Sequence, residues 1–272
     1  MPFPARALLQ AFGLSAFLLA GLLAGLSMAV SPPALAAERV DLELVLLADA
    51  SGSIDDDEIF FQRQGYAEAI TDPDILAAIG LGHDGKIAVT YVEWGNASSQ
   101  EVVVPWTIID GEASAAAFAQ QLLEKPRQAF GRNAIGSAIA AGLALIENND
   151  IDGFRKIIDF SGDSANNWGG LPVQAARDAA LAADVSINGL AILCRPCASG
   201  RPVSYDLEQA FREDIIVGPA SFVVTVDGDQ SFAEAVRKKL LLEVAGVPDE
   251  QTFRLRLAAA RSSQADSEAP LQ

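Results

Sequence analysis

The sequence predicts an α/β domain with a doubly wound, mostly parallel sheet, one antiparallel edge strand and helices on both faces. Two observations predict this class. β-rich segments alternate with amphipathic helical segments after about residue 37, as in sheets whose parallel strands are joined by helical crossovers. The strands are also almost continuously apolar, as expected where helices cover both faces of a sheet.

The composition fits one large domain or two small ones and limits the function. The 272 residues are 50% hydrophobic and carry a formal net charge of −17, from 36 acidic and 19 basic side chains. Such a chain lacks the basic surface that replaces phosphate counterions, so the charge argues against nucleic-acid binding and against docking on anionic lipid. A cationic partner or a bound cation fits it better. His83 is the single histidine, which excludes a His-rich metal centre.

Residues 1–36 are expected to be a secretory signal peptide. No charged residue occurs from Ala7 to Ala37, and small residues at Ala34 and Ala36 match the Ala-x-Ala cleavage pattern. An uncleaved membrane anchor is the alternative, because the apolar run approaches spanning length. Cleavage would place the mature chain in an oxidising space, secreted or periplasmic.

The first half of the domain is expected to contain three strands and two helices. The strands lie at 40–48, 86–94 and 101–109, and the helices at 55–70 and 113–124. The last two strands are expected to form an antiparallel pair, and Pro105, which cannot donate a ladder hydrogen bond, indicates that the second lies at the sheet edge. Glu43 is an unexpected charge in a strand that should be buried on both faces.

The second half continues the alternation. We expect a helix from about 134, a strand at 157–160, a helix at 173–183, a strand at 185–193, a short helix at 206–211, a strand at 221–226 and a helix at 232–244. Tyr205 and Phe211 are expected in the core. The domain proper is assigned to 37–246, with 247–272 as a C-terminal extension. From Arg261 the polar, aperiodic sequence predicts a disordered tail.

The loop after the first strand carries the strongest chemical signal. In an open parallel sheet, ligands bind beyond the carboxyl ends of the strands. Asp49, Ser51 and Ser53 follow the first strand at alternate positions, so an extended turn points one carboxylate and two hydroxyls the same way. Such hard oxygen ligands suit Mg²⁺. The alternative is a helix start, in which Ser53 and Asp56 form a capping box, although Asp49 and Ser51 are not needed for a cap.

The pattern Asp49-x-Ser51-x-Ser53 resembles the metal-ion-dependent adhesion site of von Willebrand factor type A domains, and the resemblance implies their Rossmann-like fold. It also implies a second ligand in the loop Gly131-Arg132-Asn133, where Asn133 stands in place of the family's Thr. Short matches in order along most of the chain, among them Val104-Pro105-Trp106, are similar to a bacterial family of secreted type A domain proteins without an assigned activity.

The resemblance implies a third, acidic ligand just after the fourth main strand. Asp163 is the match in the segment Ser161-Gly162-Asp163, and Asp159, within the strand, is the rival. An ordinary polar turn is the alternative explanation of the segment that begins at Asp163.

The two cysteines lie close together in Cys194-Arg195-Pro196-Cys197. In an oxidising compartment this spacing favours a structural disulfide that closes the loop after the strand at 185–193. A redox-active pair is the alternative, although thioredoxin-like pairs open a helix and Ala198–Pro202 is poor helix material. A zinc knuckle would lack two of its four ligands.

We therefore expect a secreted, non-enzymatic module that binds an unknown protein partner through a divalent cation, Mg²⁺ or else Mn²⁺ or Ca²⁺. The resemblance implies that an open coordination position accepts a carboxylate from that partner. Three alternatives remain open: a hydrolase that uses a metal-bound water with Asp159 or Asp163 as base, thiol–disulfide exchange through Cys194 and Cys197, and a structural fold whose site has decayed. Membrane attachment is expected only if the signal segment is uncleaved.

Overall fold

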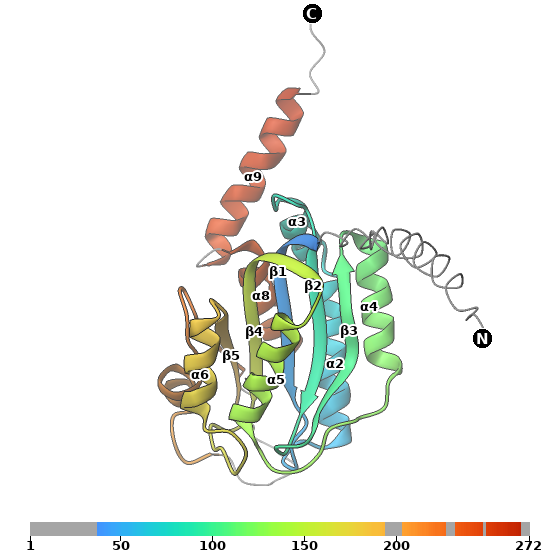
Figure 1. Cartoon of the computed structure of the whole chain (residues 1–272). Helices are drawn as coiled ribbons and strands as arrows, with labels where there is room; N and C mark the ends of the chain where they lie inside the picture. Colours follow the sequence, from blue (N-terminus) through green and yellow to red (C-terminus); the bar gives the residue numbers. More distant parts are fainter. Residues whose placement is uncertain (1–36, 194–202, 227–231, 247–248, 268–272) are drawn as a thin grey trace, which may run out of the picture. The chain divides into compact units, whose positions relative to one another are not determined.

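The computed structural model describes residues 37–193, 203–226, 232–246 and 249–267 (Figure 1). The predicted signal peptide and the Cys194–Cys197 pair lie outside the described residues. Within those ranges, none of the helices is both long enough and apolar enough to cross a bilayer.

The strands form one six-stranded sheet in the order β3-β2-β1-β4-β5-β6. Their bounds are β1 Glu38–Asp49, β2 Ile87–Trp94, β3 Gln100–Ile109, β4 Ile151–Gly162, β5 Ser186–Ile192 and β6 Val223–Val226. All neighbours pair in parallel except β2 and β3, which are antiparallel. The predicted sheet, with one antiparallel strand at its edge, is confirmed. β4 begins earlier than expected, because its first residues pair with the start of β1.

Helices cover both faces of this sheet (Figure 1). One face packs against α2 (Asp56–Ile70), α3 (Pro73–Gly80), α4 (Glu112–Glu124) and α8 (Phe232–Ala245), and the other against α5 (Ile135–Glu147), α6 (Val173–Ala182), α7 (Leu207–Ala210) and the π-helical turn η1 (Phe211–Ile215). The side chains of β1 alternate between the two cores. Leu44 and Leu46 enter the first, and Val45 and Leu47 enter the second. This double burial explains why β1 is apolar at nearly every position.

Glu43 is fully buried in β1, and its environment accounts for the charge. Its carboxylate accepts hydrogen bonds of 2.8 Å from the backbone N–H of Gly153 and from Nδ2 of Asn149, and Nζ of Lys156 lies 3.8 Å away. A Cβ at residue 153 would lie 2.7 Å from Cγ of Glu43, so glycine provides the room for this side chain. The charge is tolerated because its lone pairs are used.

Three local predictions are corrected. The capping box of α2 is formed by Asp55 and Glu58, each accepting the other's backbone N–H at 2.8 Å, and not by Ser53 and Asp56. The predicted elements omitted α3, which starts at the cap Asp72 and is only 8 residues long. The tail predicted from Arg261 is helical as far as Ser267, as the end of α9 (Glu250–Ser267).

The helix α9 extends through that region because its first turns are anchored. Phe253 is 2% exposed and belongs to the core that α3 and α8 share, so α9 packs against both helices. Leu257, one turn later, packs on the same core, and two apolar contacts in a helix of 18 residues leave too little periodicity for the pattern alone to reveal it.

Candidate metal centre

The turn after β1 gathers the predicted oxygen ligands. Asp49 and Ser51 are both fully buried, and Oδ1 of Asp49 accepts the backbone N–H of Ser51 at 2.8 Å. The hydroxyl oxygens of Ser51 and Ser53 lie 3.1 Å apart. Because the cap of α2 uses Asp55 instead, neither serine is committed to starting the helix.

Asp163, just beyond β4, lies beside this turn. Burial, followed by repulsion from Asp163, raises the pKa of Asp49 to about 7. Burial also raises the pKa of Asp163, opposed by a hydrogen bond from Ser53. A Cβ at Gly162 would come within 3.3 Å of Oδ2 of Asp49, so glycine keeps the space between the strand ends open. The structure thus brings Asp49, Ser51, Ser53 and Asp163 together.

The rival Asp159 lies elsewhere. It is buried within β4, on the face covered by α8, and its Oδ1 is 2.6 Å from Nζ of Lys239. Asp159 is still inside β4 and its side chain is buried in the core, whereas Asp163 lies beyond the last residue of β4, Gly162, and is not held to that face by the pleat.

The loop that carries Asn133 packs directly on the turn. The carbonyl of Gly131 accepts the backbone N–H of Gly52 at 2.8 Å, and Gly131 has a φ of 102°, which favours glycine. Asn133 is buried, and its Nδ2 finds no hydrogen-bond partner among the described residues. Its carbonyl accepts the backbone N–H of Trp168 at 2.8 Å, which ties this loop to the one after β4.

The chemistry of these residues fits a hard divalent cation. Oδ2 of Asp49 and Oδ1 of Asp163 are both buried and lack hydrogen-bond partners within the described part of the chain. Two unpartnered carboxylate oxygens that repel each other are costly unless a positive charge compensates them. The described residues hold no cluster of three or more His, Cys, Asp and Glu placed for a metal, so a cation here would depend on hydroxyl, amide and water oxygens beside the two carboxylates.

Arg127 holds the backbone of the turn, a role that the sequence analysis missed. Its Nη2 donates to the carbonyls of Ala50 and Ser51 at 2.6 and 3.1 Å, and its Nη1 donates to the carbonyl of Ile54 at 2.9 Å. One guanidinium therefore holds three backbone carbonyls of the turn, from Ala50 to Ile54.

A buried ion pair in turn holds the segment that carries Arg127. Arg63 of α2 and Glu93 of β2 are 4% and 0% exposed, with Nη2 of Arg63 2.6 Å from Oε1 of Glu93. Glu93 also accepts the backbone N–H of Gln128 at 2.9 Å, and Arg63 donates to the carbonyl of Pro126 at 3.0 Å. The sequence signal for this ion pair is that Arg63 and Glu93 are charged residues at positions that the helix and strand patterns assign to the core.

We expect Arg127→Met to weaken Mg²⁺ affinity by about tenfold, the usual lower limit for losing a group that orients metal ligands. The turn would lose three donors while every oxygen ligand remains. Calorimetric titration with Mg²⁺ measures the change. Arg132→Met is the matched control, because Arg132 is exposed and stacks on Trp168 instead of the turn. Equal affinity in the Arg127 variant and the wild type would contradict this role.

Comparisons with known proteins identify the family and the fold. Residues 39–248 match the family model described as "Protein of unknown function (DUF1194)". No curated protein sequence matches the chain significantly. Among solved structures, proximal thread matrix protein 1 from the mussel byssus, with a zinc-occupied MIDAS motif, aligns at 14% identity and a TM-score of 0.50, covering 77% of this chain and 46% of that one.

The pilus adhesin SpaC from Lactobacillus rhamnosus GG, in its open conformation, aligns at 14% identity and a TM-score of 0.51, covering 76% of this chain and 30% of that one. The chain therefore spans less than half of either protein, and identities this low show a shared fold alone. The order of the strands, the position of the turn that carries the predicted oxygen ligands and these alignments agree with the sequence resemblance. The chain belongs to the DUF1194 family, and its fold is that of a von Willebrand factor type A domain.

Proposed function

We propose that this protein is a metal-ion-dependent protein-binding module, secreted or periplasmic. Asp49, Ser51, Ser53 and Asp163 would hold the cation, with the amide oxygen of Asn133 beside them. The observation that carries the proposal is the pair of buried carboxylate oxygens, one on Asp49 and one on Asp163, without hydrogen-bond partners in the described structure.

When bound, the cation would supply a positive attachment point for a carboxylate of the partner. Mg²⁺ is the first choice, because the donors are hard oxygens, and Mn²⁺ or Ca²⁺ could use the same set. The mussel protein, which shares this fold and has a zinc-occupied MIDAS motif, supports the proposal that a divalent cation is bound. In this chain the residues themselves orient the site: Arg127 holds the turn, and Gly162 leaves space beside Asp49.

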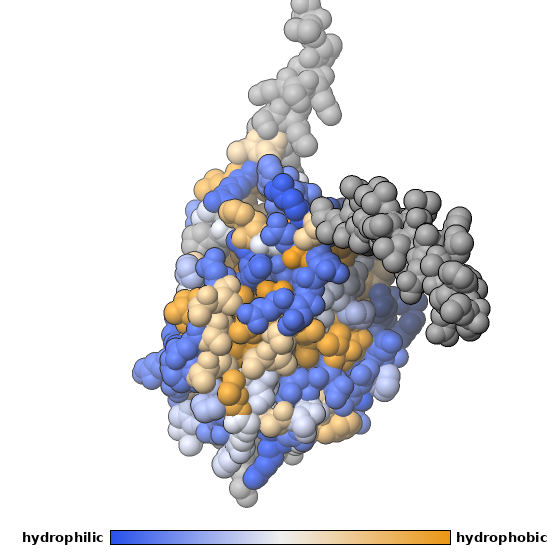
Figure 2. Space-filling view, viewed as in Figure 1, coloured by the Kyte–Doolittle hydropathy of each residue, from blue (hydrophilic) through white to orange (hydrophobic). Residues whose placement is uncertain are grey.

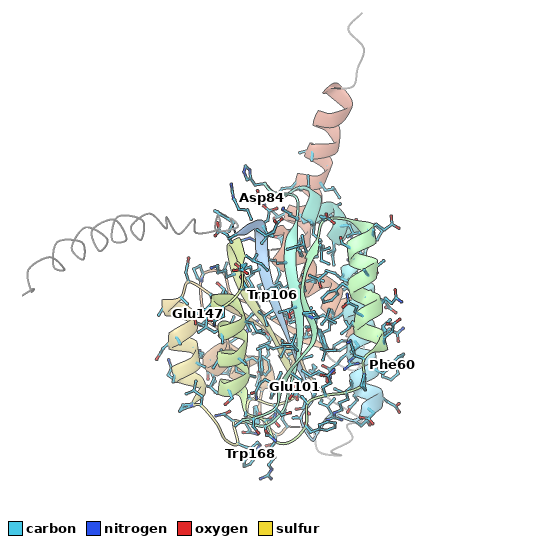
Figure 3. The ribbon with its side chains drawn as sticks, turned by 45° about the vertical axis from the view of Figure 1, so that its right-hand side comes forward. Phe60, Asp84, Glu101, Trp106, Glu147 and Trp168 are labelled. Atoms are coloured by element: carbon cyan, nitrogen blue, oxygen red, sulfur yellow. The ribbon has the colours of Figure 1, made fainter. Side chains whose placement is uncertain are left out.

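Exposed aromatic side chains around the site suit a protein partner. Trp168 is 62% exposed, and the guanidinium of Arg132 lies 5.0 Å from its ring centroid. Phe130, on the same loop as Arg132, is 54% exposed. Figure 3 shows Trp168 at the end of the molecule opposite Asp84, which is the end that the carboxyl ends of the parallel strands reach. Tryptophan and arginine are typical of interface hot spots, and Arg132 offers positive charge to an acidic partner.

Figure 2 shows hydrophilic residues interspersed with apolar ones over the face that carries α5, α6 and β3. Tyr205, which the sequence placed in the core, is instead 38% exposed, and its hydroxyl accepts the backbone N–H of Ala165 at 2.9 Å. It thus supports the loop between Asp163 and Trp168.

Binding is favoured over hydrolysis by the position of Asp159. A hydrolase would need a general base beside the cation, and Asp159, one of the two candidates, is paired with Lys239 in the core. Only Asp163 remains, and it is needed to hold the cation. Thiol–disulfide exchange through Cys194 and Cys197 stays an untested prediction.

Affinity capture tests the proposal. The immobilised protein is exposed to an extracytoplasmic extract of its source organism, with Mg²⁺ or with a chelator. We expect a partner that is retained only with Mg²⁺ and is lost with Asp49→Ala. Trp168→Ala should reduce retention about tenfold, because losing an aromatic anchor costs about 1.4 kcal/mol of binding free energy, which is about tenfold in affinity. The same variant should leave Mg²⁺ affinity unchanged. Unchanged capture of the partner by the Asp49 variant would refute metal-dependent binding.

A further inference from the structure

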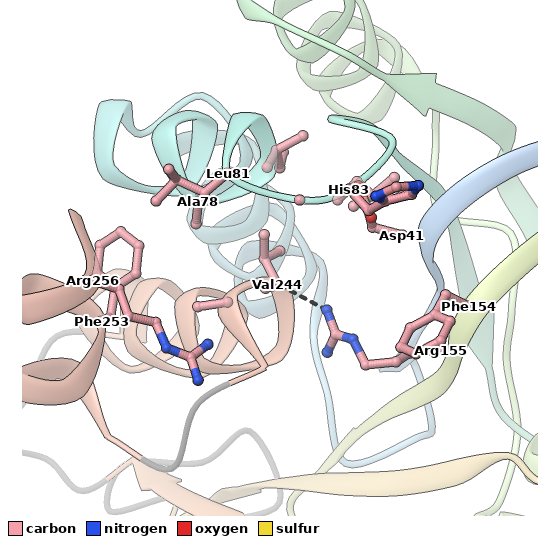
Figure 4. Close-up of a pocket in the computed structure, with 13 residues that line it drawn as sticks. Asp41, Ala78, Leu81, His83, Phe154, Arg155, Val244, Phe253 and Arg256 are labelled. Carbon is pink, nitrogen blue, oxygen red and sulfur yellow. Dashed lines mark hydrogen bonds between the residues drawn. The ribbon is translucent and has the colours of Figure 1, made fainter. Parts of the chain in front are cut away.

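A separate cavity of about 390 Å³ opens at the end of the sheet opposite the candidate metal centre, where β1, β2 and β4 begin (Figure 4). Asp41 of β1, Ile87 of β2 and Arg155 of β4 form its floor, and residues of α3, α8 and α9 close its sides. Its volume is within the range of small-molecule sites. None of the residues that gather at the candidate metal centre lines it.

Arg155 brings a largely buried positive charge to this cavity. Its Nη1 and Nη2 donate to the carbonyls of Glu243 and Val244, at 2.5 and 2.7 Å, near the end of α8. These acceptors are neutral, and no ion pair of Arg155 occurs among the described residues. Burial lowers the pKa of Arg155, which reflects the cost of holding the charge there. A guanidinium has five N–H donors, so donors remain for a ligand.

A second guanidinium lines the same cavity. Arg256 extends from α9 and is drawn with Arg155 among the lining residues in Figure 4. The carboxylate of Asp41 lies near His83, and its oxygens accept the backbone N–H groups of Asp84 and Lys86 at 3.1 to 3.4 Å. Arg155 and Arg256 thus bring two positive charges to the cavity against the one carboxylate of Asp41, which leaves a locally positive site in a chain of net charge −17.

The remaining walls are apolar. Ile79, Val244 and Phe253 line the cavity from the core side, and Phe154, at its rim, is 89% exposed. A ligand would thus meet two guanidinium groups and an apolar surface within one cavity. We propose that this cavity binds a small organic anion in which an oxyanion, a carboxylate or a phosphate, is attached to a short apolar chain. Arg155 and Arg256 bind the oxyanion, and the apolar walls cover the chain.

Calorimetric titration of the purified protein with decanoate, below its micellar concentration, tests the proposal. We expect saturable binding at one site, with decanol and acetate each at least tenfold weaker, because one lacks the charge and the other lacks the chain. Decyl phosphate, run alongside, reports which oxyanion is preferred. Equal affinity for decanol and decanoate, or no saturable binding of either decanoate or decyl phosphate, would overturn the proposal.

Variants locate the site. Arg256→Gln should weaken decanoate binding by about tenfold, the loss expected for one charge-assisted hydrogen bond. Arg254→Gln is the matched control, because Arg254 is on the same helix and does not line the cavity. Arg155→Lys, with folding checked by circular dichroism, keeps the charge and should bind more weakly than the wild type. Asp49→Asn should bind decanoate normally, which separates this proposal from the metal centre. Equal affinity in the Arg256 and Arg254 variants would rule out the arginine pair.

Discussion

Asp49→Asn is expected to abolish saturable Mg²⁺ and Mn²⁺ binding and to leave the protein folded. The substitution keeps the shape of a fully buried side chain and removes one of the two carboxylates that compensate the cation. Titration calorimetry with each metal measures the loss. Asp57→Asn is the matched control, because it makes the same change at an exposed position in the first turn of α2. If the Asp49 variant bound Mg²⁺ and Mn²⁺ with the same isotherms as the wild type, this site would be refuted.

The same substitution should stabilise the metal-free protein at pH 8. The pKa of Asp49 in the fold is about 7, above its ordinary value of 3.8, so ionisation opposes folding. The penalty is complete above pH 7, becomes small near pH 4 and disappears below it, where the carboxyl is protonated in both the folded and the unfolded state. We expect a gain of about 1–3 kcal/mol at pH 8 and little gain at pH 4. Urea unfolding at both pH values measures it, and a loss of stability at pH 8 would contradict the assignment.

The Mg²⁺ affinity of the wild-type protein should follow the ionisation of Asp49. Protons compete with the cation for Asp49, so Mg²⁺ affinity should fall as the pH drops below 7. Titrations at pH 8 and pH 5.5 compare the two regimes. An affinity that does not change between them would show that Asp49 is not a ligand.

Lys239→Met is expected to destabilise the fold by about 3–5 kcal/mol at pH 8, the usual cost of breaking a buried ion pair. Nζ of Lys239 is 2.6 Å from Oδ1 of Asp159 and also pairs with Glu243, and none of the three is more than 1% exposed. Without the ammonium, two carboxylates would face each other in the core between α8 and the sheet. Asn188, which donates to Glu243 at 2.9 Å, cannot replace the lost charge.

The loss should shrink at acidic pH. Burial, and then repulsion from Asp159, raises the pKa of Glu243 to about 7 against an ordinary value of 4.5. Removing Lys239 raises carboxyl pKa values in the fold further, so the variant regains stability as the pH falls from 7 toward 4.5. Urea unfolding at pH 8 and pH 5 gives both values. Lys238→Met, at the exposed neighbouring position, is the control, and equal effects of the two substitutions would show that the buried cluster contributes nothing.

The sequence by itself determined the features that depend on neighbours along the chain. The apolar run of β1 followed by Asp49, Ser51 and Ser53 specifies a buried strand and a turn with three oxygens on one side. Pro105 specifies an edge strand, because no surrounding structure can restore its missing N–H. These features are local, because the residues that determine them are neighbours in the sequence.

The tertiary structure alone decided the features that depend on which face a side chain takes and on which distant segment meets it. Asp159 and Asp163 are close in sequence, yet Asp159 lies inside β4 and pairs with Lys239, whereas Asp163 lies beyond the end of β4, beside Asp49. Arg127 reaches carbonyls more than 70 residues away, at Ala50 and Ile54. Burial makes such contacts strong by removing water, and burial is a property of the assembled layers, which no local pattern of residues contains.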